Sequence, residues 1–322
     1  MLNKTVDWHL LVVIINYRTP KLVCDALSSL ERELDHTEAH VVVVDNNSGD
    51  NSCEFINQHI SKENYKSWVT LVSAELNGGF SYGNNIGMKF ANADYYLFLN
   101  SDAYVLPGAI INLLEAMESD NKVGIVGPKL EWPDGSQQVS CFKNLTPQNG
   151  FLSAVKTGIF TKLFTLFGIK EVAISLDQHQ IERPEWLSFA CVMLRGQMVK
   201  EIGLMDEGYF MYREDNDYCR RATEAGWGLV FAPKSKVVHL NKGASNQMGL
   251  KRLPRYYFQS RSRYFIKYYG RLGLFMANLY WSLGRCISLL RELIQRKPKE
   301  FHSTMLFDIW VGFLTQVRKN EE

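Results

Sequence analysis

Short apolar runs alternate with amphipathic stretches over the first three quarters of the chain. The first run, residues 9–16, is rich in Val, Ile and Leu, and the Thr19-Pro20 pair that follows is typical of a helix start. A second apolar run, residues 41–44, ends in a polar turn. Runs of this kind predict strands buried on both faces, and successive strand–helix units predict right-handed crossovers and a parallel sheet.

The same alternation continues to residue 239. We expect further strands at residues 69–74, 95–99, 123–126, 186–194 and 228–232, and helices at residues 86–91, 110–117 and 215–225. The pattern therefore predicts an α/β fold with a mostly parallel central sheet flanked by helices.

Polar residues follow the strand predicted at residues 95–99 without a break. They are Asn100, Ser101 and Asp102. Open α/β sheets bind ligands beyond the carboxyl ends of their strands, so Asp102 is a candidate site residue. A single Asp after a strand is also typical of a turn or a helix cap, and the rest of the chain has to decide between the two.

A glycine-rich stretch, residues 77–85, precedes the helix predicted at residues 86–91. It matches neither G-x-G-x-x-G nor a Walker loop. We interpret it as a loop whose glycines allow close backbone approach and which leads into a helix N-terminus that favours an anion. An ordinary strand-to-helix turn explains the stretch equally well.

Five carboxylates lie among aromatic residues between positions 206 and 217. Asp215 is expected to begin the helix that Gly226 ends. Acids at a helix start are commonly N-caps, which is our interpretation of Asp217, but acids beside aromatic side chains also serve as tuned general bases. His239 follows the last predicted strand, where an isolated histidine is more often a surface residue than a ligand.

Composition limits the class of protein. The chain has 322 residues and is 46% hydrophobic, which suits a large globular domain with an appendage and excludes disordered and fibrous classes. Its six cysteines form no C-x-x-C pair, so neither a zinc site nor a disulfide framework is indicated and a cytoplasmic setting is the simplest interpretation. The apolar run at residues 10–15 is too short for a signal peptide.

Charge divides the chain near residue 250. Residues 1–250 hold 22 Lys and Arg against 29 Asp and Glu, a balance of −7, whereas residues 251–299 hold 12 against one, a balance of +11. We therefore predict a catalytic or binding domain at residues 1–250 and a basic, aromatic-rich helical segment at residues 251–322 that meets an anionic membrane surface. No nucleic-acid recognition module accompanies the basic residues, so no nucleic acid is expected as a partner.

An apolar span at residues 272–290 raises the question whether the segment crosses the membrane or lies on its surface. Its length is near that of a transmembrane helix, but Arg285 lies two thirds along it and favours a re-entrant or surface-lying helix. A second apolar helical pattern covers residues 306–317 and could equally pack on the body. The expected location is the inner face of the cell membrane, peripherally attached. Residues 133–185 contain no grouping that indicates a chemical role.

Six motifs lie in order along residues 8–245. They are Val-Val-Ile-Ile-Asn-Tyr (12–17), Val-Asp-Asn-Asn-Ser (44–48), Asn-Gly-Gly-Phe-Ser-Tyr-Gly-Asn-Asn (77–85), Leu-Asn-Ser-Asp (99–102), Phe-Met-Tyr-Arg-Glu-Asp-Asn-Asp-Tyr-Cys (210–219) and His239. Together they resemble the inverting glycosyltransferases of family two, which have the GT-A fold, and most of all their rhamnosyltransferase branch.

The resemblance implies a donor site. Asp45 matches the acid that hydrogen-bonds the pyrimidine base of the nucleotide, and Asn16 and Tyr17 lie where the first strand meets that base. The other residues expected to contact the donor are Asn77, Gly78, Asn84, Asn100 and Ser101.

The resemblance also implies a metal site and a base. Asp102 matches the last acid of the D-x-D metal motif, whose first acid is replaced by Asn100, and His239 matches a further metal ligand. The implied cofactor is Mg²⁺ or Mn²⁺, held in part by diphosphate oxygens and water. Asp215 matches the catalytic base, with Glu214 beside it, and would take a proton from the acceptor hydroxyl as that oxygen attacks and inverts the anomeric carbon.

The implied reaction is sugar transfer in cell-surface polysaccharide synthesis, with dTDP-rhamnose as the expected donor and a lipid-linked oligosaccharide as the acceptor. One alternative is another UDP- or dTDP-sugar donor, and a second is a membrane-tethered binding module without catalysis. A sugar nucleotidyltransferase would carry a Gly-rich loop with Arg and Lys after the first strand, which residues 16–20 do not resemble. The sequence contains no signal for an oligomeric state.

Overall fold

A computed structural model describes residues 8–34, 38–155, 172–173, 184–240, 252–296 and 302–311. The chain divides into two compact units. The first consists of Met1–Cys141, Ser175–Phe210 and Glu214–Met248, and the second of Phe142–Ile174, Met211–Arg213 and Gly249–Glu322. The predicted division at residue 250 placed the stretches 142–174 and 211–213 with the first unit, whereas the structure places them with the second.

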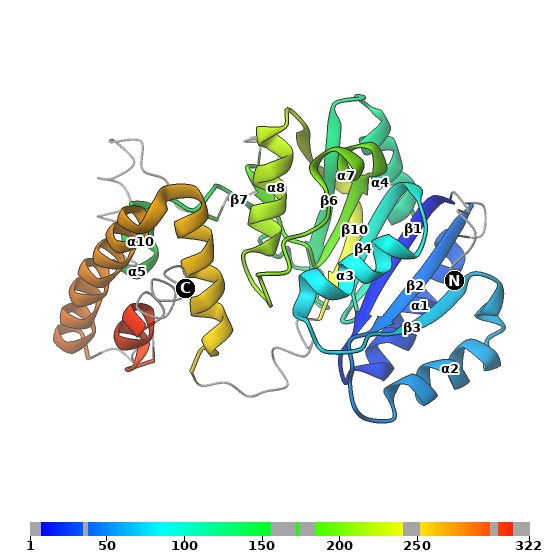
Figure 1. The fold of residues 1–322 in the computed structure, drawn as a ribbon, viewed down its shortest axis with the longest axis horizontal. Helices are drawn as coiled ribbons and strands as arrows, with labels where there is room; N and C mark the ends of the chain where they lie inside the picture. The colour runs from blue at the N-terminus through cyan, green and yellow to red at the C-terminus, as the bar shows by residue number, and fades with distance from the viewer. Residues whose placement is uncertain are drawn as a thin grey trace. The chain divides into compact units, whose positions relative to one another are not determined.

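An eight-stranded sheet forms the centre of the first unit within the described residues, in the order β3-β2-β1-β4-β9-β6-β10-β5 (Figure 1). The strands are β1 (Trp8–Asn16), β2 (Ala39–Asp45), β3 (Val69–Ser73), β4 (Ala93–Asn100), β5 (Ala103–Val105), β6 (Val123–Glu131), β9 (Cys191–Arg195) and β10 (Gly228–His239). Strand pairing is parallel except where β9 meets β4 and β6 and where β5 meets β10. The predicted mostly parallel sheet is confirmed.

Helices cover both faces of this sheet. They are α1 (Pro20–Leu34), α2 (Ser52–Lys62), α3 (Gly79–Phe90), α4 (Ala109–Glu118), α7 (Gly196–Ile202) and α8 (Glu214–Glu224), with a 3₁₀ turn η1 (Tyr65–Ser67). Side chains alternate between the two faces of a strand. Val12 of β1 accordingly joins the core with Leu27 of α1 and Leu113 of α4, whereas Val13 faces α3 on the other side.

The glycine-rich stretch is helical from Gly79 onward, so the loop predicted at residues 77–85 is wrong. A Cβ atom on Gly87 would lie 2.3 Å from Cγ1 of Val13, and glycine therefore lets α3 lie directly on β1. Gly79 has φ +85°, and a Cβ atom there would lie 1.9 Å from the carbonyl oxygen of Phe210. Helix packing, rather than a ligand loop, explains these glycines.

The strand predicted at residues 186–194 is two strands. β8 (Trp186–Leu187) pairs with β7 (Cys141–Phe142) in a separate two-stranded sheet, and β9 then enters the main sheet. Between them, the backbone N–H of Ser188 donates to the carbonyl of Ser140. The apolar run at residues 186–194 does not show that its two halves pair with different strands, because apolar residues would be buried in either sheet.

The second unit is helical over most of its described residues. Helix α5 (Asn149–Val155) packs on α10 (Arg255–Ile294), which bends at Gly270, where φ is 69°. Residues 305–311 form one more helical stretch, and residues 312–317 of the predicted apolar pattern lie outside the described residues. Among the described helices, none has both the length and the hydropathy of a membrane span.

Candidate active site

Strand direction gathers the predicted site residues of the first unit at one edge of the sheet. β1, β2 and β4 are parallel neighbours, and β6 and β10 run in the same direction because β9 is antiparallel to both β4 and β6. The carboxyl ends of β1, β2, β4 and β10 therefore share this edge, and they carry Asn16, Asp45, Asn100 and His239. Ligands of open α/β sheets bind at such an edge.

Asn16 and Asp45 form one buried network with Ser48. The Asn16 side-chain nitrogen donates to Oδ1 of Asp45 at 2.6 Å, and the Ser48 hydroxyl donates to the same oxygen at 2.6 Å. Oδ2 of Asp45 accepts the backbone N–H of Ser48 at 3.1 Å. A carboxylate has about four lone-pair positions, so Asp45 is fixed in place and still has acceptor capacity for a ligand N–H.

Ser101 joins this network through Thr19. The two hydroxyls are 3.1 Å apart, and both the backbone N–H and the hydroxyl of Thr19 donate to Oδ1 of Asn16. Tyr17 is half-buried beside the Arg18 guanidinium, whose central carbon lies 5.2 Å from the ring centroid. The end of β1 and the turn after β4 are thereby held together.

The start of α3 is tied to the end of β2. The Asn46 side-chain nitrogen donates to Oδ1 of Asn77 and to the carbonyl of Gly79, both at 3.0 Å. Gly78 precedes the helix, and a Cβ atom there would lie 2.4 Å from Cγ of Tyr82. Asn84 is 1% exposed and donates to the carbonyl of Phe80 within α3, which indicates a structural role for this predicted donor contact.

Asp102 and His239 form the second group at this edge. Nε2 of His239 lies 3.5 Å from Oδ1 of Asp102, and the two side chains are 15% and 6% exposed. The backbone N–H of Leu240 donates to the Asp102 carbonyl at 2.8 Å, which fixes the end of β10 against the turn after β4. Asn100, between the two groups, donates its backbone N–H to the carbonyl of Ala190.

Gln138 determines the tautomer of His239. Its side-chain nitrogen donates to the carbonyls of His239, at 2.6 Å, and Glu131, at 3.3 Å, so its oxygen is the atom that faces Nδ1 of His239 at 3.0 Å. Nδ1 must then carry a hydrogen. In the neutral ring this leaves the lone pair of Nε2 directed at the Asp102 carboxylate, an arrangement that favours a cation between the two groups.

These two side chains fit a divalent cation as partial ligands. A hard cation takes about six donors, mostly oxygens. Within the described part of the chain there is no group of three or more His, Cys, Asp and Glu side chains arranged for a metal. An ion held by Asp102 and His239 would therefore take its remaining donors from substrate oxygens and water.

The predicted catalytic acids lie in the first turn of α8. Glu214 is 7% exposed, and Asp215 is half-buried and accepts the backbone N–H of Asn216 at 2.8 Å. Asn216 is fully buried, and neither atom of its amide has a hydrogen-bond partner. A buried unpaired amide costs about 1–3 kcal/mol, which a protein rarely tolerates away from a functional site.

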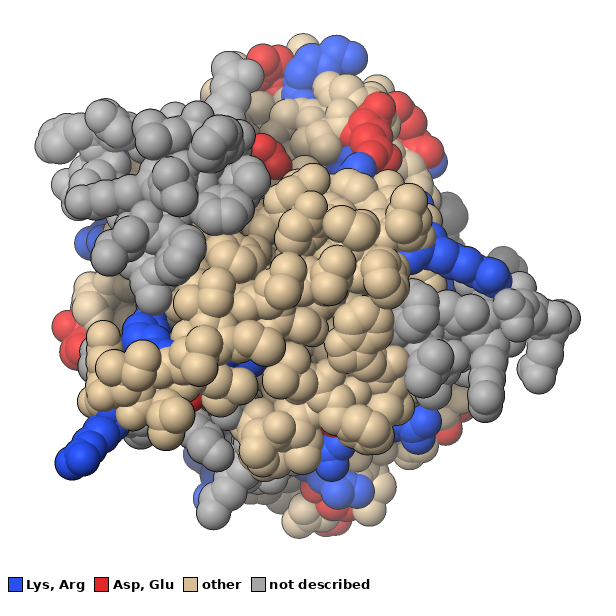
Figure 2. All heavy atoms as spheres, turned by 90° about the vertical axis from the view of Figure 1, so that its left-hand side faces the viewer, with Lys and Arg blue, Asp and Glu red and all other residues tan. Residues whose placement is uncertain are grey.

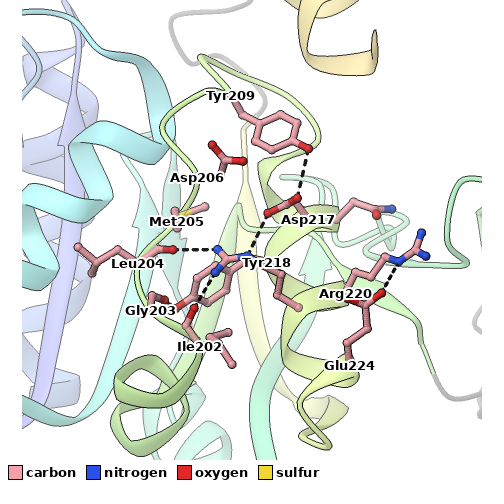
Figure 3. Close-up of polar contacts among 12 residues, drawn as sticks. Ile202, Gly203, Leu204, Met205, Asp206, Tyr209, Asp217, Tyr218, Arg220 and Glu224 are labelled. Carbon is pink, nitrogen blue, oxygen red and sulfur yellow. Dashed lines mark hydrogen bonds and ion pairs between the residues drawn. The ribbon is translucent and has the colours of Figure 1, made fainter. Parts of the chain in front are cut away.

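Asp217 has a structural role, but it lies inside α8 and not at the N-cap position that we expected for it (Figure 3). Its carboxylate accepts the hydroxyl of Tyr209 at 3.2 Å and Nε of Arg221 at 3.1 Å, and it is 1% exposed. The guanidinium of Arg221 also donates to the carbonyls of Ile202 and Leu204. Asp217 therefore anchors α8 to the chain after α7.

Sequence reasoning missed Ser48 and Gln138. Ser48 stands inside the quoted motif at residues 44–48, so its position was a usable signal. Gln138 lies in a region to which the sequence assigned no role. The turn that Pro133-Asp134-Gly135 predicts does form, and it reverses the chain after β6. Gly135 has φ +81°, and Glu131 pairs with Gln137. The register of that hairpin against β10 was not readable from the sequence.

The four buried cysteines offer no nucleophile. Burial raises the pKa of the Cys24 thiol to about 11 and that of Cys141 to about 12. Cys191 and Cys219 are fully buried, and burial raises their pKa values further. Their thiols stay protonated at neutral pH, so carboxylates and His239 are the chemically active groups here.

The fold and this edge define an α/β domain with candidate ligand residues at the carboxyl ends of parallel strands. Comparison with known proteins shows what this domain is similar to. Residues 11–154 match the family described as Glycosyl transferase family 2. Over these residues the chain is similar to glycosyl transferase family 2, as the motifs implied, and the curated relatives below include rhamnosyltransferases.

Two curated relatives of the chain are rhamnosyltransferases. The N-acetylglucosaminyl-diphospho-decaprenol L-rhamnosyltransferase of Mycobacterium tuberculosis (strain CDC 1551 / Oshkosh) is 28% identical over 207 residues, which cover 63% of this chain and 64% of the relative. Rhamnosyltransferase WbbL of Escherichia coli (strain K12) is 21% identical over 238 residues, which cover 71% and 82%. The match to the first relative thus spans less than two thirds of its length.

Solved structures show the same fold. Mannosyltransferase PcManGT from Pyrobaculum calidifontis, in complex with GDP-Man and Mn²⁺, matches with a TM-score of 0.56 at 14% identity over 98% of this chain and 88% of the other. S. aureus TarS 1-349 matches with a TM-score of 0.52 at 16% identity over 97% and 81%. The GT-A type of fold implied by the sequence is therefore confirmed.

Proposed function

We propose that the protein is an inverting glycosyltransferase that moves rhamnose from dTDP-rhamnose to a lipid-linked oligosaccharide at the inner face of the cell membrane, in cell-surface polysaccharide synthesis. The observation that carries the proposal is the placement of two polar groups, Asn16–Asp45–Ser48 and Asp102–His239, at one sheet edge of a family 2 domain. The names of the two relatives support rhamnose as the sugar.

Donor binding begins at Asp45. Its carboxylate is oriented by Asn16 and Ser48, so the remaining lone pairs are directed before the ligand arrives. A pyrimidine base has a ring N–H that such an acceptor recognises, and a preorganised acceptor loses little conformational entropy on binding. Asn16 and Ser48 therefore act by holding Asp45, and Tyr17 supplies an aromatic surface beside them.

Asp102 and His239 would hold Mg²⁺ or Mn²⁺ together with the diphosphate. When bound, the ion supplies positive charge where the departing nucleoside diphosphate develops negative charge. Gln138 keeps Nε2 of His239 available for that ion by accepting a hydrogen bond from the Nδ1–H group. With Asn100 in place of a second acid, the protein contributes one carboxylate, so ion and nucleotide should bind in a mutually dependent way.

Asp215 would accept the proton of the acceptor hydroxyl. The attacking oxygen forms a bond to the anomeric carbon as the bond to the diphosphate oxygen breaks on the opposite side, so one displacement inverts the configuration. The half-buried position of Asp215 at the start of α8 suits this role, since a positioned base contributes about 10²–10⁴-fold.

The test is release of nucleoside diphosphate from a panel of dTDP-, UDP- and GDP-sugars, with and without Mg²⁺ or Mn²⁺. Wild type should release dTDP from dTDP-rhamnose in the presence of the ion, and Asp215→Asn should reduce the rate by about 10²–10⁴-fold. Glu224→Gln is the matched control, since it removes an exposed acid at the other end of the same helix. Its rate should equal that of wild type.

Other results would separate the alternatives. An unchanged rate in Asp215→Asn would exclude Asp215 as the base. Full activity after chelation would exclude the metal role of Asp102. Donor binding by wild type without release from any sugar nucleotide, in the presence of acceptor lipid, would favour the binding module over the enzyme.

A further inference from the structure

The side chain of Arg18 is held in place although it is exposed. Lys and Arg side chains at the rim of the face in Figure 2 extend outward from the surface. Arg18 instead donates its Nε–H to the carbonyl of Ser48 at 2.9 Å, and its guanidinium carbon lies 5.2 Å from the centroid of the Tyr17 ring. A hydrogen bond and a cation–π contact therefore restrain this guanidinium before any ligand binds.

The backbone of Arg18 is strained at the same point. Its φ is +58°, in the left-handed region, and its N–H donates to the hydroxyl oxygen of Ser48 at 3.0 Å. This conformation is costly for most residues with a Cβ atom, and glycine, asparagine and aspartate adopt it most readily. Asn47, in the turn that contains Ser48, has a φ of +54°. A turn that only joined β1 to α1 would be expected to carry one of these residues at position 18, so the strain points to a role for the arginine side chain.

Ser48 connects Arg18 with Asp45. A serine hydroxyl has one hydrogen and two lone pairs, and all three are used here. The hydroxyl donates to Oδ1 of Asp45 and accepts hydrogen bonds from the side-chain nitrogen of Asn16 and the backbone N–H of Arg18. Ser48 is 1% exposed, so one buried residue holds a carboxylate and a guanidinium next to each other.

The turn after β2 also contains Asp50, whose charge interacts with that of Arg18. Hydrogen bonds from Ser52 lower the pKa of the Asp50 carboxyl, and the positive charge of Arg18 lowers it to a smaller extent. Oδ1 of Asp50 accepts the backbone N–H of Ser52 at 3.0 Å. Within the described residues, the hydrogen bonds of Arg18 use its backbone N–H and Nε, which leaves the four N–H groups of its two terminal nitrogens for a ligand.

Asp45 and Arg18 together offer a hydrogen-bond acceptor and several donors. Thymine and uracil have the complementary pattern on their Watson–Crick edge, because the N3–H group lies between two carbonyl oxygens. Proteins that read a single base commonly bind this edge. A base that donates its N3–H to Asp45 presents a carbonyl oxygen on either side of that hydrogen bond, where a neighbouring guanidinium can donate.

We propose that Arg18 determines the base specificity of the donor site, by donating from a terminal nitrogen to a carbonyl oxygen of the pyrimidine whose N3–H is accepted by Asp45. The inference rests on the proposed function, since it takes a pyrimidine nucleotide as the donor. A charged donor makes a stronger hydrogen bond than a neutral one. Cytosine has a lone pair at N3 where thymine and uracil have an N–H, so it would face the Asp45 carboxylate with the wrong polarity.

The diphosphate is the other part of the donor that an arginine could bind. Both hydrogen bonds of Arg18 go to Ser48, which belongs to the Asp45 group. In the described residues neither goes to Asp102 or His239, the pair proposed to hold the ion and the diphosphate. The contacts of Arg18 therefore favour the base.

The first experiment compares wild type with Arg18→Met, which keeps a long side chain and removes the guanidinium. In calorimetric titrations with Mn²⁺ present, dTDP and UDP should each bind at least about tenfold more weakly to Arg18→Met. The matched control is Arg32→Met, which removes an exposed guanidinium from the last turn of α1. Both affinities should be unchanged in that variant.

Thio-substituted nucleotides test the contact with the carbonyl oxygen itself. Sulfur accepts hydrogen bonds weakly, so wild type should bind either 2-thio-dTDP or 4-thio-dTDP at least about threefold more weakly than dTDP. Arg18→Met should bind dTDP and that analogue equally. A preference for oxygen that persists in Arg18→Met, or that is missing in wild type, would overturn the proposal, because an arginine that acts on the diphosphate or through the turn would not change this ratio.

Arg18→Gly separates ligand binding from stability. Glycine adopts a φ of +58° without steric strain, so this variant should unfold at a temperature no lower than Arg18→Met and should bind dTDP as weakly. Unchanged dTDP affinity in both variants would overturn the role of Arg18 and leave the proposed function intact. A wild-type protein that binds no pyrimidine nucleotide would overturn both.

Discussion

In the first unit, buried polar side chains gather at one edge of a sheet, where Asp45, Asp102 and His239 end or follow strands. In the second unit, Arg285 and Glu292 are buried between helices and bind each other. Both arrangements satisfy hydrogen bonds, but only the first leaves acceptor capacity at an edge where ligands of such sheets bind. Burial of polar residues therefore does not identify a site; their place in the fold does.

The largest effect should come from breaking the buried pair of the second unit. Arg285→Met leaves Glu292 buried without its partner and should lower the free energy of unfolding by about 3–5 kcal/mol. The double variant Arg285→Met with Glu292→Leu should lose much less, because no uncompensated charge remains. Urea unfolding followed by circular dichroism measures both. A single variant as stable as wild type would show that α10 turns a different face inward.

The next largest effect should come from adding a side chain to Gly79, which lies close to another backbone segment at the sheet edge of the first unit. Gly79→Ala adds a Cβ atom 1.9 Å from the Phe210 carbonyl at φ +85°, so we expect a loss of about 2–4 kcal/mol. Gly49→Ala is the matched control, since its φ is +67° and nothing lies within 4 Å of the added atom. That variant should lose about 1 kcal/mol. Equal losses in thermal unfolding would contradict the packing of α3 against Phe210.

Substitution of two acids in the first turn of α8 should separate a structural role from a catalytic role. Asp217→Asn weakens the contacts to Tyr209 and Arg221 and should cost about 1–3 kcal/mol of unfolding free energy while the rate per folded molecule stays within about twofold. Asp215→Asn should show the reverse, with normal stability and a greatly reduced rate. Loss of activity in folded Asp217→Asn would assign that acid to the chemistry instead.

The smallest effect should follow from Gln138→Met, which removes the acceptor that fixes the tautomer of His239. We expect about tenfold weaker Mn²⁺ binding, measured by electron paramagnetic resonance, and a changed ¹⁵N chemical shift of the His239 ring. Gln137→Met changes the exposed neighbour on the same hairpin and should alter neither. Unchanged Mn²⁺ affinity in Gln138→Met would remove Gln138 from the proposed site.

Much of the sheet was predictable, because the apolar runs around Val12, Val43 and Leu97 are strand-length and flanked by turns. The predicted residues Asn16, Asp45, Asp102 and His239 do meet at one edge, since strand direction alone brings them there. The start of α3 was not predictable, because glycine is a poor helix former and Gly79 is held there by its close approach to the Phe210 carbonyl. The contact between Gln138 and His239 could not be predicted without the register of a hairpin. The inward direction of the Arg285 side chain could not be predicted without the packing of α10.

The central proposal is that a nucleoside diphosphate and a divalent ion bind together at Asp102 and His239. Calorimetric titration of dTDP into wild type and Asp102→Asn, each with Mn²⁺ and with chelator, tests this most directly. Wild type should bind dTDP at least about tenfold more tightly with Mn²⁺, and Asp102→Asn should lose that gain while keeping the weak binding seen with chelator. The same dTDP affinity in all four titrations would contradict the account.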